Sequence, residues 1–249
     1  MSEPLSISEI FSSIQGEGLL AGRRQIFIRL SGCNLVCRYC DTEHSKNDSC
    51  RVELKPGSNV FDQLNQPVEL PQLLDILMDW CIALPGAHHS ISLTGGEPLL
   101  FAGILADWLP DLRKILPIHL ETNGTLPVEL GRIIEQVDYI SMDMKLPSTA
   151  DCDEDLWDLH QQFLENAHNT NVSVKIVAGD STPVAEIQRV CSIINSVRPE
   201  TPLFIQPLTL CDNSCGVAAA HLLHLQALAA DLLPDVRVIP QMHRLMGVL

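Results

Sequence analysis

The sequence predicts an α/β fold in which helices cover a parallel sheet. Short runs rich in Ile, Val and Leu alternate along the chain with longer stretches that have helical periodicity. Continuous apolar runs are typical of parallel strands, because both faces of such a sheet are buried. The alternation repeats six times and no internal sequence repeat interrupts it. These observations favour a full or partial barrel, or a doubly wound sheet.

Each predicted strand is followed by a predicted helix. The strand-like runs are residues 26–30, 90–94, 118–122, 139–145, 172–178 and 203–208, with a last one at 236–240. The helical stretches between them are residues 69–84, 101–109, 128–136, 154–167, 184–196 and 217–232. Pro127 and Pro183 lie where two of these helices begin, and proline favours the first turn of a helix.

Residues 1–249 are predicted to form a single domain, because single barrels commonly reach this length and no linker divides the chain. One stretch breaks the alternation of strands and helices. Residues 43–67 are polar and contain Pro56, Gly57 and many Asn, Gln, Asp and Ser residues. We expect this stretch to be an insertion in the first βα connection.

The composition excludes several classes of protein. Hydrophobic residues make up 46% of the chain, which is ample for a large core. Sixteen basic and 31 acidic residues give a net charge of −15, which disfavours nucleic acids and anionic membranes as partners. No apolar run approaches the roughly 20 residues that span a bilayer, and the first residues do not resemble a secretory signal. We therefore expect a soluble, cytoplasmic protein.

Polar residues gather where the predicted strands end. In barrels and open α/β sheets, chemistry is built at the carboxyl ends of the parallel strands. The alternative is that strand ends simply turn polar as they enter loops, but loops favour Ser, Asp and Asn over Lys and Glu. The residues are Arg29 and Cys33 at the first strand, Thr94, Gly95, Gly96 and Glu97 at the second, Glu121 and Asn123 at the third, Asp143 and Lys145 at the fourth, Lys175 in the fifth, and Gln206 and Pro207 at the sixth.

Cys33, Cys37 and Cys40 place three thiols on one tight loop after the first predicted strand, with the spacing CxxxCxxC. Thiolates are soft ligands that suit iron–sulfur clusters or zinc. Three cysteines can hold three corners of a [4Fe–4S] cluster and leave the fourth iron open for a substrate or cofactor. The alternative is a structural zinc site with His44 or Cys50 as its fourth ligand.

The cysteine triplet and the segment Gly95-Gly96-Glu97-Pro98 together resemble the radical S-adenosylmethionine superfamily. The resemblance implies a partial (β/α)6 barrel, a [4Fe–4S] cluster and S-adenosylmethionine bound to the open iron. Glycines let the backbone approach a ligand closely, which fits a segment that meets the amino group of the cofactor.

Further motifs are similar to one family within that superfamily, the 7-carboxy-7-deazaguanine synthases. They are IQGEG at 14–18, CDT at 40–42, ETNG at 121–124 and QMHR at 241–244. The resemblance covers nearly the whole chain except residues 43–67. It implies a radical ring contraction of 6-carboxy-5,6,7,8-tetrahydropterin that releases ammonia. The alternatives are a glycyl-radical-enzyme activase and a non-enzymatic zinc-binding module.

The resemblance also implies roles for single residues, beginning with the substrate side. Glu121 and His243 are expected to steer protons as catalytic residues. Gln15 offers both a donor and an acceptor to a pterin edge, and Arg29 offers a bidentate partner to a carboxylate. For Arg29, an internal salt bridge to Glu17 or Glu121 is the alternative. The expected substrate contacts are Ile14, Gln15, Gly16, Glu17, Arg29, Thr94 and Leu249.

On the cofactor side, Cys33, Cys37 and Cys40 are the expected cluster ligands. Thr42 matches a Mg²⁺ ligand, although the residue alone favours a helix N-cap. A homodimer and a flavodoxin-like electron donor are further implied. The match to the family is looser at residues 141–145, where this chain has the sequence SMDMK. The expected contacts to S-adenosylmethionine are Gly95, Gly96, Glu97, Asn123, Ser141, Asp143, Lys145, Gln206 and Pro207.

Two other features are assigned no chemistry. Cys211 and Cys215 form a second CxxxC pair, but two thiols without further nearby cysteines cannot hold a cluster, so we expect a structural or loop role. His88 and His89 are predicted to lie in a solvent-exposed loop.

Overall fold

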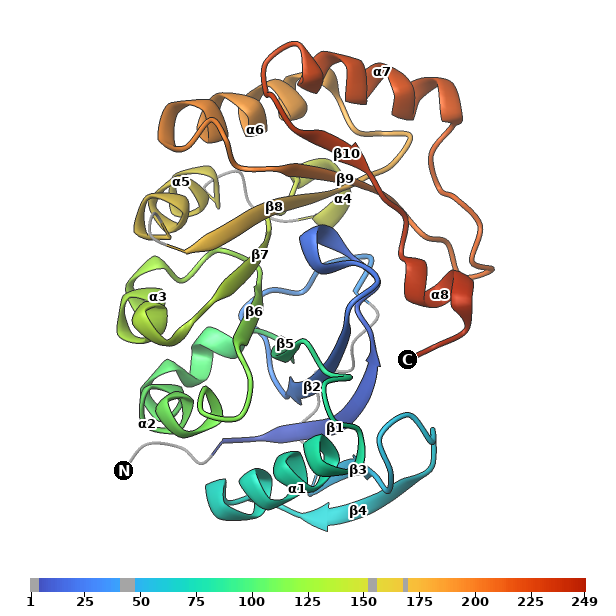
Figure 1. The fold of residues 1–249 in the computed structure, drawn as a ribbon. Helices are drawn as coiled ribbons and strands as arrows, with labels where there is room; N and C mark the ends of the chain where they lie inside the picture. The colour runs from blue at the N-terminus through green and yellow to red at the C-terminus, as the bar shows by residue number, and fades with distance from the viewer. Residues whose placement is uncertain (1–4, 41–47, 152–155, 168–169) are drawn as a thin grey trace.

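Ten strands form one mixed sheet in the computed structural model, which describes residues 5–40, 48–151, 156–167 and 170–249. The strand order is β10-β9-β8-β7-β6-β5-β2-β1-β3-β4 (Figure 1). The strands are β1 (Ile7–Ile14), β2 (Arg24–Leu30), β3 (Ser49–Glu53), β4 (Phe61–Asn65), β5 (Ser90–Gly95), β6 (Ile118–Thr122), β7 (Tyr139–Asp143), β8 (Asn171–Ala178), β9 (Leu203–Pro207) and β10 (Val236–Val238).

The predicted parallel sheet is confirmed. From β2 through β5 to β10, each strand runs parallel to its neighbour. The order is linear, with β10 at one edge and β4 at the other, so the curved sheet is a partial barrel rather than a closed one. Every strand predicted from an apolar run is present within two residues of its expected ends.

The helices lie on the outside of the curved sheet (Figure 1), as expected for right-handed βαβ connections. The short C-terminal helix α8 lies apart from the others, on the opposite side of the sheet. The helices are α1 (Leu70–Ala83), α2 (Ala102–Leu112), α3 (Pro127–Ile133), α4 (Pro147–Ala150), α5 (Leu156–Asn166), α6 (Val184–Val197), α7 (Ala219–Ala230) and α8 (Met242–Met246), with 3-10 turns at Gly18–Leu20, Pro98–Phe101 and Ile134–Gln136.

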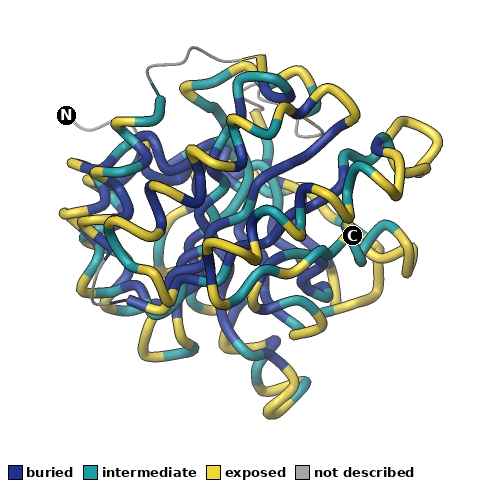
Figure 2. The backbone as a smooth tube through the Cα atoms, turned by 90° about the horizontal axis from the view of Figure 1, so that it is seen from above, coloured by how far each residue is buried: buried dark blue, intermediate teal, exposed yellow. Residues whose placement is uncertain are grey.

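The main core fills the layer between the sheet and the helices. Alternate strand residues such as Ile28, Leu93 and Leu120 point into it and are at most 1% exposed. Successive strand residues point to opposite faces, so the residues between them line the other side of the sheet. That side carries many polar residues, and it too is largely buried in the interior of the molecule (Figure 2).

The structure corrects the expectations at the N-terminal side of the sheet. Strand β1 was not predicted; it runs antiparallel to β2 and extends the sheet beyond it. The described part of the polar stretch 43–67 contains the hairpin β3–β4, and β3 pairs with β1. The described part of this stretch therefore lies between β2 and α1 in the chain and continues the sheet.

The prediction that His88 lies in a solvent-exposed loop is also wrong. Its side chain is 7% exposed, and its Nε2 lies 2.9 Å from the Ser12 hydroxyl on β1. The prediction was wrong because β1 was missed, and β1 covers the position where His88 enters β5.

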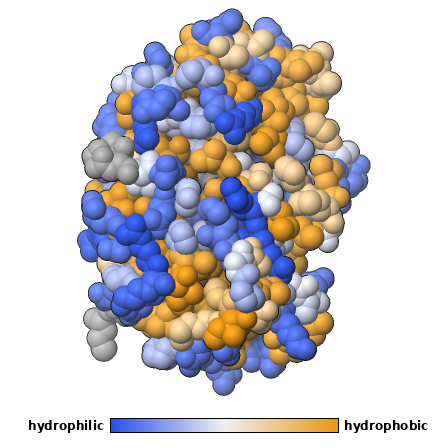
Figure 3. All heavy atoms as spheres, in the orientation of Figure 1, coloured by the Kyte–Doolittle hydropathy of each residue, from blue (hydrophilic) through white to orange (hydrophobic). Residues whose placement is uncertain are grey.

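Among the described residues, no helix is long and apolar enough to cross a membrane. Figure 3 shows that hydrophilic and hydrophobic residues are interspersed on the face seen in Figure 1, without a continuous apolar band. In the part of the chain that the structure describes, 15 large hydrophobic side chains are exposed, and scattered exposure of this kind is ordinary for a protein surface.

Candidate active site

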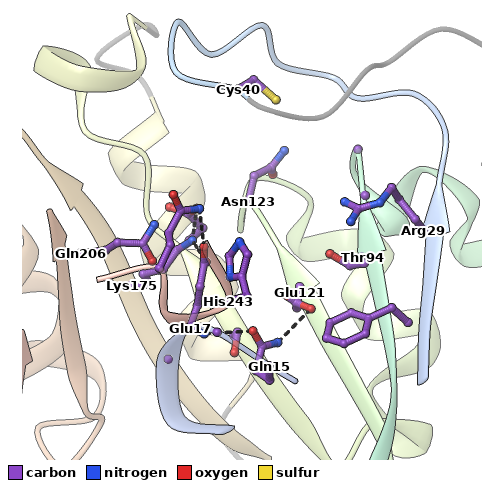
Figure 4. A pocket seen from close by; sticks show the side chains of 18 of the residues that line it. Gln15, Glu17, Arg29, Cys40, Thr94, Glu121, Asn123, Lys175, Gln206 and His243 are labelled. Carbon is purple, nitrogen blue, oxygen red and sulfur yellow. Dashed lines mark hydrogen bonds and ion pairs between the residues drawn. The ribbon is translucent and has the colours of Figure 1, made fainter. Parts of the chain in front are cut away.

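The carboxyl ends of the parallel strands surround a cavity of about 580 Å³. Its wall also includes β1, the cysteine loop after β2 and the C-terminal segment (Figure 4). The predicted site residues that line it are Ile14, Gln15, Gly16, Glu17, Arg29, Cys33, Cys37, Cys40, Thr94, Gly95, Gly96, Glu121, Asn123, Ser141, Asp143, Lys145, Gln206, His243 and Leu249.

Two of the described site residues that were predicted do not line this cavity, because Glu97 and Pro207 are buried behind its wall. Thr42, the predicted Mg²⁺ ligand, lies outside the described residues. The exposed thiols of Cys211 and Cys215 also lie outside the cavity, in the loop after β9.

The three cysteines of the CxxxCxxC loop line one side of the cavity. The backbone N–H of Arg38 donates to the Ala150 carbonyl at 3.1 Å and ties the loop to the rest of the protein, and the N–H of Cys40 donates to the Cys37 carbonyl at 3.1 Å within the loop. The Cys33 sulfur accepts a hydrogen bond from the backbone N–H of Leu35 at 3.4 Å. Burial raises the pKa of the Cys37 thiol to about 11, and coordination to a metal is what would make it a thiolate at neutral pH.

These thiols fit an iron–sulfur cluster better than a single metal ion. Among the described residues, no three His, Cys, Asp or Glu side chains converge closely enough to hold one ion. A cubic cluster does not need such convergence, because each cysteine binds a different iron. The zinc alternative also loses Cys50 as fourth ligand. Its buried thiol on β3 donates to the Arg51 carbonyl and does not reach the cavity; His44 lies outside the described residues.

The glycines after β5 let this strand pack directly against the cysteine loop. A Cβ on Gly96 would lie 1.7 Å from the Gly32 carbonyl oxygen, so only glycine fits there. Gly95 has a φ of +112°, which favours glycine as well. The backbone N–H of Glu97 donates to the same Gly32 carbonyl at 2.9 Å. The cavity wall at this point is therefore bare backbone.

Glu97 holds the neighbouring strand end in place. Its carboxylate, which is fully buried, accepts hydrogen bonds from the backbone N–H groups of Leu99 (3.0 Å) and Asn123 (2.8 Å) and from the Thr122 hydroxyl (2.9 Å). Burial raises the pKa of Glu97 to about 7 despite these donors. The side chain therefore fixes Asn123 rather than facing the cavity.

Asn123 in turn is bound to the cysteine loop. Its Nδ2 donates to the Asn34 side chain at 2.8 Å and lies 3.8 Å from the Cys33 sulfur. Asn34 also donates to the Thr125 hydroxyl at 2.9 Å. Asn34 was missed in the sequence, where nothing but its position inside the cysteine motif singles it out.

A network of four charged side chains crosses the cavity wall from β7 to the turn after β1. Lys145 lies 2.9 Å from Asp143, and Lys175 lies 3.0 Å from Asp143 and 2.5 Å from Glu17. Burial alone would raise the pKa of Asp143, but the two lysines lower it to about 2. All four groups are therefore charged at neutral pH, and their charges sum to zero.

The C-terminal segment and the cysteine loop extend this network. Gln241 donates to Glu17 at 2.8 Å, and Lys145 donates to the Tyr39 hydroxyl at 3.2 Å. Tyr39 and Gln241 were not predicted as site residues. Tyr39 lies inside the cysteine motif, and Gln241 precedes His243 in a motif that was recognised.

Below the cavity lies a buried polar layer on β2, β5 and β6. Glu121 accepts hydrogen bonds from the Ser92 hydroxyl (2.5 Å) and from Gln15 (3.2 Å). Burial, together with the charge of Glu17, raises the pKa of Glu121. His119 lies beneath, with Nε2 2.8 Å from the Ser141 hydroxyl and Nδ1 3.2 Å from Gln25.

Arg29 has an internal partner, but it is neither of the two that were predicted. Its Nε lies 3.3 Å from the carboxylate of Glu9 on β1, whereas Glu17 binds Lys175 and Glu121 binds Ser92. Sequence reasoning missed Glu9 because it missed the strand that carries it.

The C-terminal segment closes the cavity from the side of β1. Met242 donates its backbone N–H to the Gly16 carbonyl at 3.0 Å, and the Ser13 hydroxyl donates to a Leu249 oxygen at 2.7 Å. A Cβ on Gly16 would lie 2.1 Å from Nδ1 of His243, so the ring of His243 rests on bare backbone. Figure 4 shows His243 between Glu17 and Asn123.

Comparison with known proteins is consistent with this arrangement. Residues 27–181 match the family model described as the radical SAM superfamily. The chain is 48% identical over 251 residues to a 7-carboxy-7-deazaguanine synthase of Geobacter sulfurreducens, and the match covers 100% of both chains. It is 36% identical to an enzyme of the same name from Methanothermobacter thermautotrophicus, with 97% of each chain covered.

Among solved structures, the fold is similar to that of QueE from Escherichia coli. The TM-score is 0.58 at 20% identity, and the match covers 96% of this chain and 94% of the other. At this identity, the likeness supports the fold rather than the chemistry.

Proposed function

Because this chain belongs to the radical S-adenosylmethionine superfamily and, within it, to the 7-carboxy-7-deazaguanine synthases, we propose that its cavity binds 6-carboxy-5,6,7,8-tetrahydropterin beside S-adenosylmethionine. The chain is a carbon–nitrogen lyase that forms 7-carboxy-7-deazaguanine, with a [4Fe–4S] cluster and S-adenosylmethionine as cofactors. The other product in the proposed reaction is ammonia.

One observation carries the assignment of the site. The three thiols of the cysteine loop line the same cavity as Arg29, Glu121 and Lys175, which come from three different strands. Cys33, Cys37 and Cys40 would hold the cluster and leave one iron for the amino and carboxylate groups of the cofactor. When bound there, the cluster would supply the electron for reductive cleavage of S-adenosylmethionine.

The chain's own residues would orient the cofactor. The bare backbone at Gly95 and Gly96 offers carbonyl groups to the methionine ammonium, and Asn123 is held beside Cys33 by Glu97. We therefore assign Glu97 a positioning role instead of a direct contact. The ribose, the carboxylate and the adenine of S-adenosylmethionine would contact other residues of the cavity wall, namely Ser141, Asp143, Lys145 and Gln206.

On the substrate side, Gln15 and Glu17 face the cavity from the turn after β1, and Glu121 lies beside Gln15, which donates a hydrogen bond to it (Figure 4). Burial raises the pKa of Glu121, which suits a carboxyl that takes or gives a proton during the reaction. His243, seated on Gly16, would supply a second such group during ring rearrangement and loss of ammonia. The carboxylate of Leu249 would complete this side of the site, with Thr94 and Ile14 in contact.

Several further assignments remain proposals that follow from the resemblance. They are a Mg²⁺ ion held by Thr42 and the substrate, a homodimer, a flavodoxin-like electron donor, and a single domain comprising residues 1–249. Against the activase alternative, the cavity carries polar groups on all sides that suit a small polar molecule. Cofactor cleavage that strictly requires a partner polypeptide would favour the activase.

The test is product analysis under anaerobic conditions. Reconstituted protein is incubated with the tetrahydropterin, S-adenosylmethionine, Mg²⁺ and reductant, and the products are identified by mass spectrometry. We expect 7-carboxy-7-deazaguanine, 5′-deoxyadenosine and ammonia from the unmodified protein and none of them from the Cys37→Ala variant. Cofactor cleavage without pterin conversion would contradict the proposed substrate.

A further inference from the structure

Three charged residues form a row across the strands that flank the cavity. In the sheet register, Glu9 on β1 lies opposite Arg29 on β2 and, on its other side, opposite Arg51 on β3. Residues in register on neighbouring strands project to the same face of the sheet. All three side chains line the cavity, and Thr94 lies opposite Arg29 at the inner end of the row.

Glu9 bridges the two guanidinium groups without satisfying both. Arg29 Nε lies 3.3 Å from Oε2 of Glu9, and Arg51 Nη1 lies 2.9 Å from Oε1. The contact between Arg51 and Glu9 is an ion pair without hydrogen-bond geometry. Oε1 of Glu9 is therefore buried without a hydrogen-bond partner among the described residues. Two guanidiniums and one carboxylate leave one net positive charge in the row.

Aromatic rings and a buried carboxylate hold the row in place. Arg29 lies over the ring of Phe11 at 5.3 Å, and Arg51 lies over the ring of Phe61 at 4.3 Å. Glu53, which is 1% exposed, accepts backbone hydrogen bonds from Ser12 on β1 at 3.0 Å and from the hairpin turn. The hairpin that carries Arg51 is thus fixed to β1, and Arg51 is held at the cavity.

The network of Lys145, Lys175, Asp143 and Glu17 elsewhere on the cavity wall is balanced, because its two lysines are paired with its two carboxylates. The row of Arg29, Glu9 and Arg51 carries one net positive charge of its own, which favours an anionic group beside it. A ligand carboxylate has two oxygens that can accept hydrogen bonds from both arginines. Contacts from Arg29 and Arg51 together would bind it more favourably than contacts from one arginine alone.

We propose that Arg51 is a second contact for the substrate carboxylate, next to Arg29, and that the hairpin β3–β4 thereby selects carboxylated pterins. This inference rests on the proposed function, because it takes the 6-carboxypterin as the ligand. Arg51 lies in the stretch 43–67, outside the sequence motifs that indicate the family, so those motifs assign it no role.

The test compares two ligands on two variants. The stable, fluorescent 6-carboxypterin and pterin without the carboxyl group are titrated onto reconstituted protein carrying S-adenosylmethionine. For Arg51→Met, we expect affinity for 6-carboxypterin to fall at least about tenfold, the scale of one charge-assisted contact, while affinity for pterin changes less than about twofold. Arg51→Lys should restore part of the loss. Lys55→Met removes a charge from the exposed turn of the same hairpin and should bind both ligands like the unmodified protein.

Two results would overturn the inference. An equal loss for both ligands would mean that Arg51 only supports the shape of the cavity, and no loss for either would mean that it does not touch the ligand. Cluster absorbance and the thermal midpoint of each variant verify that folding is intact. If the unmodified protein fails to bind or convert the carboxylated pterin at all, the proposed function fails instead, and the two failures are thereby distinguished.

Discussion

The carboxylate of Asp143 on β7 lies 3.0 Å from the ammonium of Lys175 on β8, and the two residues are direct neighbours in the register of the parallel sheet. Both side chains are less than 20% exposed, at 17% and 14%. A buried ion pair in such a place adds little net stability, but removing one partner leaves the other charge unpaired. The pair therefore fixes the geometry of this part of the cavity wall.

Replacing Lys175 by methionine should destabilise the protein strongly. The substitution keeps the length of the side chain but leaves Glu17 without its ion partner and Asp143 with Lys145 alone, and losses of this kind cost about 3–5 kcal/mol. Urea unfolding of the reconstituted protein under anaerobic conditions measures the change. Lys114→Met breaks an exposed ion pair with Asp111 and should cost less than about 1 kcal/mol. If both variants lost a similar free energy of unfolding, the Lys175 network would contribute no more to stability than an exposed ion pair.

Replacing Gly16 by alanine should displace the C-terminal segment. The added Cβ would lie 2.1 Å from Nδ1 and 2.6 Å from the backbone nitrogen of His243, which belongs to the wall of the cavity. We expect faster trimming of the C-terminus by carboxypeptidase and a loss of turnover of at least about tenfold, because misplacement by about an ångström costs that much or more. Gly103→Ala on α2 meets no atom within 4 Å and serves as the control. An unchanged trimming rate in Gly16→Ala would contradict the contact.

The order of strands and helices could be predicted because the helices that connect the parallel strands cover one face of the sheet. That face must be apolar, so Ile91 and Leu93 or Ile140 and Met142 stand out in the sequence. The residues between them face the cavity, which is why a polar residue such as Glu121 at a strand end indicated the site.

Strands β1, β3 and β4 could not be predicted in the same way. Strand β4 is at the edge of the sheet, so most of its side chains are exposed or half-buried and its sequence reads as polar. The alternation of Cys50 and Val52 with exposed Arg51 was the available signal for β3. The contact of Glu9 with both arginines depends on a register between distant segments, which no local pattern reveals.

Acid should destabilise the protein partly through His119. Burial, with a contribution from His89, lowers the pKa of His119 to about 3, so the folded chain keeps this ring neutral. Below the ordinary histidine pKa of about 6.5, the unfolded chain binds a proton that the folded chain does not, and stability falls as the pH falls. Between pH 7 and pH 5.5, this difference amounts to roughly 1 kcal/mol for one group.

The variant His119→Gln tests this dependence, since glutamine is neutral at every pH. Urea unfolding at pH 7 and pH 5.5 should show a stability loss on acidification that is smaller by roughly 1 kcal/mol than in the unmodified protein. His224→Gln alters an exposed histidine on α7 and should leave the loss unchanged. An identical pH dependence in His119→Gln and the unmodified protein would mean that His119 does not stay neutral in the fold.

Each cysteine of the CxxxCxxC loop should be required for the cluster. In Cys33→Ala, Cys37→Ala or Cys40→Ala, two thiols remain and cannot hold a cubic cluster with one open iron. Anaerobic reconstitution should then give little iron and sulfide and no visible absorption that dithionite bleaches. Cys215→Ala removes an exposed thiol outside the cavity and should reconstitute fully. Zinc bound tightly by the unmodified protein in place of iron would point to the structural-zinc alternative.

We propose that this cavity holds S-adenosylmethionine beside C6 of the pterin, so that the 5′-deoxyadenosyl group takes its hydrogen from that carbon. Mass spectrometry of the 5′-deoxyadenosine formed from substrate deuterated at C6 measures this transfer. We expect the 5′-deoxyadenosine to gain one deuterium during conversion to 7-carboxy-7-deazaguanine. Unlabelled 5′-deoxyadenosine, formed while the deuterium stays in the pterin or its product, would contradict it.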